Sequence, residues 1–265
     1  MDSDFQKEEE FHDRWAKQIN LGEVMVDEFF EACISSENRY IYNCLGDVTG
    51  KKILELGCGA GEASVYFAKH GAVVTASDLS GGMLEIAKRL AEIHNVDLTV
   101  VQCRSDEIPF ADETFDVVYA ANTLHHVDLE ATLCEARRVL KTGGHFVSWD
   151  PIAHNPFINI YRHYAVHVRT DDEHPIKMEQ IKLVKKYFPQ ATFKTTWLFT
   201  LLIFLKYFLI DRINPNKERY WKKILVEHKK IEKLYNRLEK IDQIVLQKFR
   251  FLQRYCWNIV FICKK

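Results

Sequence analysis

Three glycines and an acid further along the chain have the residue types and spacing that suit binding of a nucleoside. Gly57, Gly59 and Gly61 follow a short apolar run and precede a helical stretch. Glycines at such a turn let a ligand touch the backbone, and a helix N-terminus presents unpaired N–H groups. Asp78 ends the next apolar run, where its carboxylate can accept hydrogen bonds from both hydroxyls of a ribose.

The glycine spacing differs from the dinucleotide-binding fingerprint. A Gly-x-Gly-x-x-Gly motif needs glycine at position 62 if it starts at Gly57, or at position 64 if it starts at Gly59. The chain has Glu62 and Ser64 at these positions. A dehydrogenase is therefore disfavoured.

Histidines supply the candidates for proton transfer, because imidazole is the usual base near neutral pH. His125 and His126 follow the fourth apolar run, and His154 and Tyr161 follow the fifth. We take these four as catalytic candidates. For His125 and His126, packing or capping of the helix that follows is the alternative. No His-Glu-x-x-His spacing accompanies them, and no metal site is expected.

The elements that must position these residues alternate between apolar runs and helical stretches from about residue 50 to 150, which is typical of βα units around a parallel sheet. Strands are predicted at 53–56, 72–76, 98–101, 115–120 and 145–149, and helices at about 61–70, 80–94 and 128–140, the last ending before a turn at 141–144. Later residues predict a helix at 178–188 and two strands at 191–197 and 255–263.

Composition places the chain among globular proteins. It has 265 residues, of which 47% are hydrophobic and 28% are charged. Seven scattered cysteines without a Cys-x-x-Cys pair argue against a disulfide framework and a zinc site. The acidic start lacks the features of a secretory signal, so a cytoplasmic location is expected.

Five ordered motifs resemble those of the class I S-adenosylmethionine-dependent methyltransferases, in particular the small-molecule and quinone methyltransferases. They are Leu-Glu-Leu-Gly-Cys-Gly-Ala-Gly at 54–61, Ser-Asp-Leu-Ser at 77–80, Ile-Pro-Phe at 108–110 with Phe-Asp-Val-Val at 115–118, Leu-His-His at 124–126 and Arg-Val-Leu-Lys-Thr-Gly-Gly at 138–144. The resemblance implies an α/β, Rossmann-like sheet of seven mostly parallel strands with the last antiparallel. It also implies that S-adenosylmethionine binds across the carboxyl ends of the strands and leaves as S-adenosylhomocysteine.

The resemblance further implies a set of cofactor-binding residues. The three glycines would border the methionine and ribose portions, Asp78 would bind the ribose and Leu79 would pack on the adenine. Arg104 stands where the family often has an acid, so Ser105 and Asp106 become the candidates for the adenine edge. The full set is Glu55, Gly57, Cys58, Gly59, Gly61, Asp78, Leu79, Ser105, Asp106, Ala120 and Asn122.

The chain divides into a core and two additions. Residues 1–45 predict a helical lid, in which Phe11, His12 and Trp15 are candidates for covering cofactor and acceptor, together with His163 from the core; an amphipathic packing helix is the alternative. The core comprises 46–197 and 255–265, and residues 198–254 are an insertion before the last strand.

The insertion joins an apolar segment to a basic one. Residues 197–210 are almost wholly apolar, but they are fewer than the ~20 needed to cross a bilayer and Lys206 interrupts them. Residues 217–250 predict an amphipathic helix whose apolar stripe is Trp221, Ile224, Leu225, Ile231, Leu234, Leu238, Ile241 and Val245. This combination fits contact with an anionic membrane surface through 197–250; packing on the sheet or a dimer seam is the alternative.

These observations predict methyl transfer from S-adenosylmethionine to a small, hydrophobic or lipid-like acceptor. O- or C-methylation is favoured over N-methylation, and no nucleic-acid partner is expected. The alternatives are a non-catalytic nucleoside-binding scaffold and a methyltransferase acting on nucleic acid. The oligomeric state stays open, and the location is cytoplasmic with or without peripheral membrane contact.

Overall fold

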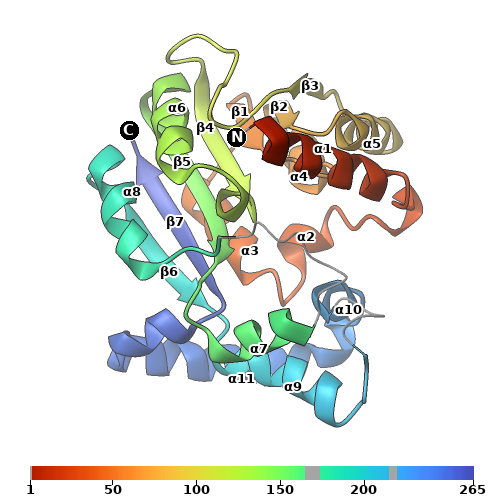
Figure 1. Ribbon diagram of the computed structural model, residues 1–265, viewed down its shortest axis with the longest axis vertical. Coiled ribbons are helices and arrows are strands. Elements are labelled where there is room, and N and C mark those ends of the chain that lie inside the picture. Colours follow the sequence, from red (N-terminus) through yellow and green to blue (C-terminus); the bar gives the residue numbers. More distant parts are fainter. Residues whose placement is uncertain (1, 165–173, 215–219) are drawn as a thin grey trace.

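The computed structural model describes residues 2–164, 174–214 and 220–265, which form a seven-stranded sheet between layers of helices (Figure 1). The strand order is β3-β2-β1-β4-β5-β7-β6. The strands are β1 (Lys52–Leu56), β2 (Val73–Asp78), β3 (Thr99–Gln102), β4 (Phe115–Ala121), β5 (Leu140–Pro151), β6 (Thr192–Thr196) and β7 (Asn258–Lys264). Only β7 runs antiparallel to its neighbours β5 and β6, so the predicted fold class is confirmed.

The central strands are apolar on both faces because helices cover both faces. Ile53 and Val117 pack toward α3 (Ser36–Leu45) and α4 (Glu62–Lys69). Leu54 and Val118 pack toward α6 (Leu129–Val139) and α8 (Ile181–Tyr187), the latter preceded by the short η4 (Met178–Gln180). All four side chains are fully or almost fully buried. The runs of apolar residues therefore read as strands with two buried faces.

Side-chain caps set the start of two helices at the carboxyl edge of the sheet. The Oγ of Ser80 accepts a hydrogen bond from the N–H of Met83 and begins α5 (Gly81–Ile93). The carboxylate of Asp128 accepts one from the N–H of Ala131 and begins α6. Both helices start within a residue or two of the prediction. The predicted turn at 141–144 was wrong, because these residues form the irregular start of β5.

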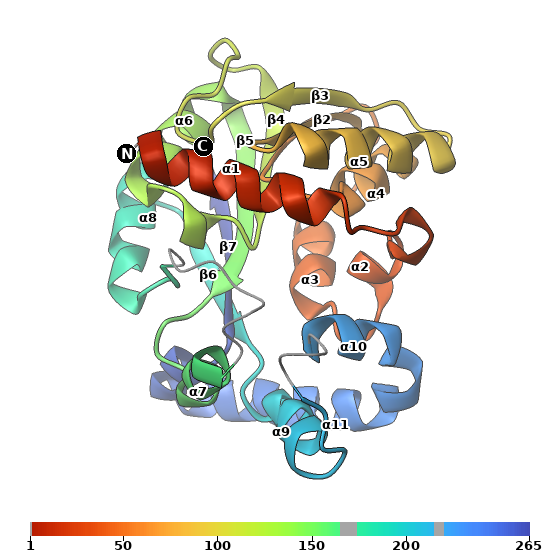
Figure 2. The ribbon, with the colours of Figure 1, turned by 45° about the vertical axis from the view of Figure 1, so that its right-hand side comes forward.

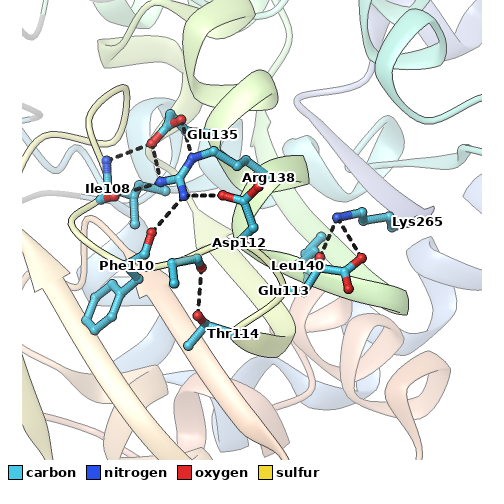
Figure 3. A network of polar contacts seen from close by, with 10 residues as sticks. Ile108, Phe110, Asp112, Glu113, Thr114, Glu135, Arg138, Leu140 and Lys265 are labelled. Atoms are coloured by element: carbon cyan, nitrogen blue, oxygen red, sulfur yellow. Dashed lines mark hydrogen bonds and ion pairs between the residues drawn. The ribbon is translucent and has the colours of Figure 1, made fainter.

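A polar network explains why two of the sequence motifs occur together (Figure 3). The guanidinium group of Arg138, in the last turn of α6, donates hydrogen bonds to the carbonyl oxygens of Ile108 and Phe110 at 2.8 and 2.7 Å. It also binds the carboxylates of Asp112 and Glu135. Arg138 thereby fastens the loop between β3 and β4 to α6, and it fixes the wall of the sheet edge on that side.

The N-terminal segment contributes α1 (Asp2–Ala16), η1 (Leu21–Glu23), α2 (Glu28–Glu31) and α3. Figure 2 shows α1 lying alongside α5. The carboxylate of Asp13 accepts hydrogen bonds from the Oγ of Ser80 at 2.5 Å and the N–H of Gly82 at 3.0 Å. Hydrogen bonding to these donors lowers the pKa of Asp13. The start of α5 therefore anchors α1 over the edge of the sheet that carries Asp78.

The insertion forms its own helical layer on α7 (Pro156–Tyr164), with η5 (Phe199–Leu201), α9 (Leu202–Leu209), α10 (Tyr220–Val226), α11 (His228–Lys248) and η6 (Arg250–Tyr255). Ile203, Phe204 and Tyr207 of α9 are buried against residues of α10 and α11. Half of the apolar segment therefore packs within the layer. No helix among the described residues has the length and apolar character that a membrane span requires.

The apolar stripe predicted for 217–250 was partly wrong. Ile224 and Ile231 are buried, but Leu234 and Ile241 are exposed. The helix breaks at Glu227, between α10 and α11, and Asp242 points inward to accept hydrogen bonds from the main chain of η5 and its flanks. Because Asp242 faces η5 to make these hydrogen bonds, Leu234 and Ile241 face solvent.

Candidate functional site

The turn between β1 and α4 places three glycines in the left-handed region, with φ of +64° at Gly57, +52° at Gly59 and +91° at Gly61. A Cβ added at Gly57 would lie 2.6 Å from Cγ2 of Thr123, and one at Gly61 would lie 2.7 Å from Cβ of Ala87. A Cβ at Gly59 would meet no atom within 4 Å. Gly57 and Gly61 are therefore required by close packing, whereas Gly59 leaves backbone open to a ligand.

Asp78 closes the other side of this turn. Its Oδ2 accepts a hydrogen bond from the N–H of Gly59 at 2.9 Å, and its Oδ1 accepts one from the N–H of Ser80 at 2.9 Å. Burial raises the pKa of Asp78, and the two N–H groups oppose that rise. The carboxyl is 9% exposed, so it is held in one orientation at the end of β2.

Glu55 lies beneath the turn and carries an unusual protonation equilibrium. Its side chain is buried, and its Oε2 accepts a hydrogen bond from the Oγ of Ser64 at 2.5 Å. Burial raises the pKa of Glu55 to about 8, with the Ser64 hydroxyl acting in the opposite direction. Near neutral pH the group is therefore largely a neutral acid in the protein without ligands.

We expect Glu55 to make the free energy of unfolding fall as the pH rises toward 8. Its folded pKa exceeds the unfolded value of about 4.3, so its contribution is fully present below the unfolded pKa and is lost as the pH rises through the folded one. The slope is at most about 1.4 kcal/mol per pH unit for this one proton. Urea unfolding of the wild type and of Glu55→Gln, at a series of pH values between the unfolded and the folded pKa, measures this fall. Because Gln stays neutral, the free energy of unfolding of the variant should rise relative to that of the wild type as the pH rises. Parallel curves of the free energy of unfolding against pH would contradict the raised pKa of Glu55.

His125 and Asp150 form a buried pair at the ends of β4 and β5. The Nδ1 of His125 lies 2.9 Å from Oδ1 of Asp150, and the main-chain N–H of His125 donates to the same oxygen at 3.2 Å. The side chains are 3% and 0% exposed. Burial raises the pKa of Asp150 well above its usual range, and the N–H groups of residues 123–125 oppose it. In the tautomer whose Nδ1–H donates to this carboxylate, Nε2 is the basic nitrogen of the neutral ring.

Helix α1 approaches this pair through a second layer of polar and aromatic residues. The Nδ1 of His126 lies 3.3 Å from Oε1 of Glu8. The rings of His125 and His126 are 4.0 Å apart, and the ring of His12 lies 6.5 Å from that of His126 and 5.8 Å from that of Trp15. The N-terminal helix and the residues after β4 therefore meet over the carboxyl edge of the sheet.

One cavity of about 730 Å³ joins these parts, within the usual size of small-molecule sites. It is lined by most of the residues that the sequence predicted for the site, namely Phe11, His12, Trp15, Glu55, Gly57, Cys58, Gly59, Asp78, Leu79, Ser105, Asn122, His125, His126 and Tyr161. Gly57 and His125 thus border the same space although they derive from different βα units.

Five predicted residues do not line this cavity. Gly61 lies beneath Ala87 and Ala120 is buried inside β4. The carboxylate of Asp106 pairs with the guanidinium of Arg104 at 2.6 Å. The Nε2 of His154 lies 3.9 Å from the carboxylate of Glu179, and His163 is exposed near the end of α7.

Sequence reasoning missed part of the cavity wall. Glu37 and Asn38 of α3 line it, together with Trp149. The Oδ1 of Asn38 accepts hydrogen bonds from the Tyr119 hydroxyl and the Trp149 Nε1, both at 2.7 Å. No motif marks Glu37 or Asn38. Asp150 could have been identified, because it directly follows the predicted strand at 145–149 and so lies at the same edge of the sheet as His125.

Among the described ranges, no group of three or more His, Cys, Asp or Glu side chains could hold a metal ion. The acidic residues around the cavity are dispersed over several elements.

Comparisons with known proteins show which sequences this chain resembles. Residues 54–148 match the model of a methyltransferase domain. A ubiquinone biosynthesis O-methyltransferase of Alkalilimnicola ehrlichii is 36% identical over 110 residues, 41% of this chain and 44% of the relative. A demethylmenaquinone methyltransferase of Tropheryma whipplei is 33% identical over 129 residues, 46% of this chain and 52% of the relative. The chain therefore spans about half the length of the curated relatives it matches.

A solved structure extends the likeness of the fold beyond the matched domain. It is a phosphoethanolamine N-methyltransferase of Haemonchus contortus in complex with phosphomonomethylethanolamine and S-adenosylhomocysteine. The TM-score is 0.56 at 21% identity, covering 92% of this chain and 56% of that one. At this identity the likeness concerns the fold.

Proposed function

Because this chain carries a class I S-adenosylmethionine-dependent methyltransferase domain, we propose that it transfers a methyl group from S-adenosylmethionine to a small, mainly hydrophobic acceptor. One observation carries the proposal. The open backbone at Gly59, held by the carboxylate of Asp78, and His125, which contacts the buried Asp150, border a single cavity. A nucleoside-binding cradle and a candidate base thus share one enclosed space.

The residues of the cradle fit the cofactor. S-adenosylmethionine supplies a methyl group that is already activated on a sulfonium. Gly57 and Gly59 would hold the methionine and ribose portions, Asp78 the ribose hydroxyls, and Leu79 with Ser105 the adenine. The open space above Gly59 supports this assignment, because a side chain there would occupy the position of a ligand.

The remaining work of the protein is alignment, exclusion of water and removal of a proton. Phe11 and Trp15 of α1 would cover the cavity, in which they are lining residues. His125 would accept the acceptor's proton at Nε2 when a hydroxyl or an acidic C–H is methylated. Asp150 would hold the ring in place through its contact with Nδ1.

The walls of the cavity away from the cradle are largely apolar, which supports a hydrophobic acceptor. They include Val24, Phe29, Ile34, Ile158, Ile224 and Leu225. The names of the relatives point to quinone-like rings as acceptors for those proteins. We therefore favour O- or C-methylation of a phenol- or quinol-like acceptor that enters the cavity from a membrane surface.

Transfer of a labelled methyl group tests the proposal. The purified chain would be incubated with methyl-labelled S-adenosylmethionine and, in separate reactions, demethylmenaquinol, a simple phenol and phosphoethanolamine. Label is expected in the quinol product and is absent from phosphoethanolamine. Binding of S-adenosylhomocysteine without transfer to any aromatic acceptor would instead favour a non-catalytic scaffold.

A further inference from the structure

The solvent-facing side of the insertion carries charge and apolar surface that the methyltransferase site does not use. We propose that this side docks on an anionic phospholipid bilayer, a proposal that rests on the proposed function for its purpose, the uptake of a hydrophobic acceptor. The argument comes from one face of α11, from the exposed residues of α9 and α7, and from the walls of the cavity.

The outer face of α11 is basic over its full length. Lys230, Lys233, Arg237, Lys240 and Lys248 fall within about 120° of arc at ~100° per residue, and we call this face the basic stripe. No acid of α11 falls within that arc, since Asp242 points into the insertion and Glu232 and Glu239 lie on other sides of the helix. Lys230 pairs at 3.8 Å with Glu227, the residue directly before α11. The face of α11 that carries the stripe has no acid of the helix itself beside its cations.

Aliphatic side chains lie among these cations. Leu234, Ile241 and Ile244 occupy the same arc of α11 and are exposed, Ile244 by 67%. The opposite face, with Ile231, Tyr235 and Leu246, is buried. A helix with one apolar face for packing needs no second one, whereas alternating lysines and aliphatics on a solvent face are typical of helices that lie at a lipid interface.

Helices α9 and α7 of the same helical layer also expose apolar residues. In α9 and the residue after it, Phe208, Leu209 and Ile210 are exposed, Ile210 by 72%. In α7, Phe157 and Ile160 are exposed. The Tyr161 and Phe204 rings join the two helices at 6.2 Å. Figures 1 and 2 both show α7, α9 and α11 together at the lower end of the molecule.

An anionic bilayer suits this surface better than a second copy of the chain. In a two-fold dimer built on the basic stripe, the five cations would face their own copies and repel. Anionic headgroups instead complement the lysines while the aliphatic side chains enter the headgroup boundary. The whole chain has a net charge of −1, so the attraction is local to this side.

The cavity connects the same elements to the methyltransferase site. Ile158 and Tyr161 of α7 and Ile224 and Leu225 of α10 line it, and Lys222 of α10 lines it beside them. A hydrophobic acceptor leaving the bilayer between α7 and α10 would therefore enter the cavity along apolar walls. The docking surface and the apolar part of the cavity belong to one helical layer.

Cosedimentation with vesicles tests the proposal. Wild-type protein would be mixed at low salt with vesicles of phosphatidylcholine alone or of a three-to-one mixture with phosphatidylglycerol. The double variant Lys233→Glu with Lys240→Glu reverses two positive charges of the stripe. The double variant Lys182→Glu with Lys185→Glu on α8 is its control, because it makes the same change of charge elsewhere. Ile244→Ser removes an exposed aliphatic side chain, and Ile93→Ser on α5 is its control, because Ile93 is also exposed.

The wild type and both controls are expected to pellet with the phosphatidylglycerol vesicles and not with the neutral ones. The stripe double variant should bind these vesicles at least about thirtyfold more weakly than the wild type. Added salt should weaken vesicle binding by the wild type. Ile244→Ser should lower partition several-fold. No wild-type binding at low salt, or equal binding by stripe and control variants, would overturn the proposal.

Two further measurements distinguish this proposal from a dimer contact and from the proposed function. Light scattering that shows a dimer, dissociated by the stripe variants, would assign the face to a second copy and overturn the lipid assignment. Calorimetry with S-adenosylhomocysteine should be the same for the wild type and the stripe variants, since none of the changed residues lines the cradle. If the wild type bound the cofactor but no vesicles, only the docking surface would be contradicted. If it bound vesicles but no cofactor, only the proposed function would be contradicted.

Discussion

Replacing His125 by alanine is expected to lower kcat by about 10²- to 10⁴-fold, the usual contribution of a general base. The reason is the buried pair: Asp150 holds Nδ1 of the ring at 2.9 Å, so Nε2 is the nitrogen proposed as the base. Binding of S-adenosylhomocysteine should change little, because the cradle lies on β1 and β2. Steady-state kinetics with a phenol- or quinol-like acceptor, beside calorimetry, separates the two effects.

The neighbouring histidine provides the matched control. His126 follows His125 in η2 and its ring is 4.0 Å away, but it pairs with Glu8 of α1. His126→Ala should therefore affect kcat much less than His125→Ala. The acidic limb of the wild-type pH–rate profile should disappear in His125→Gln and persist in His126→Gln. Equal losses for both histidines would argue that the residues after β4 only shape the cavity.

The second large effect is expected at Asp78. Asp78→Ala should raise the dissociation constant of S-adenosylhomocysteine by about 100-fold, because hydrogen bonds to a charged acceptor contribute roughly 1.5–3 kcal/mol each. Asp78 also accepts hydrogen bonds from the N–H groups of Gly59 and Ser80, so the variant frees the turn as well. Isothermal titration calorimetry measures the loss. Asp78→Asn, which keeps one acceptor oxygen, should lie between the wild type and alanine.

Asp106 is the control for this prediction. It was a sequence candidate for the adenine edge, but its carboxylate pairs with Arg104 and does not line the cavity. Asp106→Asn should leave the dissociation constant within a few-fold of the wild type. Thermal unfolding without ligand checks that both variants are folded. A large effect at Asp106 with a small one at Asp78 would move the nucleoside away from the end of β2.

The core of the fold and the cradle could be predicted because their signals are local. Ile53 and Leu54 belong to an apolar run that only a strand buried on both faces explains, and both are fully buried in β1. Gly57 directly follows β1 and Asp78 ends β2, so their meeting at the carboxyl edge follows from the parallel arrangement alone. Where an element is set by its own residues, the sequence sufficed.

The insertion shows where local signals stop. The sequence showed the helical spacing of its apolar residues, but it did not show which face of the helix is buried. Asp242 turns inward to cap η5, more than forty residues earlier in the chain, and this contact sets the buried face. Leu234 and Ile241 then face solvent, and the basic stripe becomes a surface with mixed charge and apolar character. A long-range capping contact therefore decided which face of α11 is available to a partner.

The sequence by itself determined the class of sheet, the glycine cradle and the acid beside it, since these depend on residues within one βα unit or on the order of units. Tertiary structure alone decided that His125 pairs with Asp150, that Glu8 reaches His126, and that Glu37 and Asn38 wall the cavity. The physical reason is that hydrogen bonding and burial act over a few ångströms in space, and chain distance carries no record of which side chains come that close.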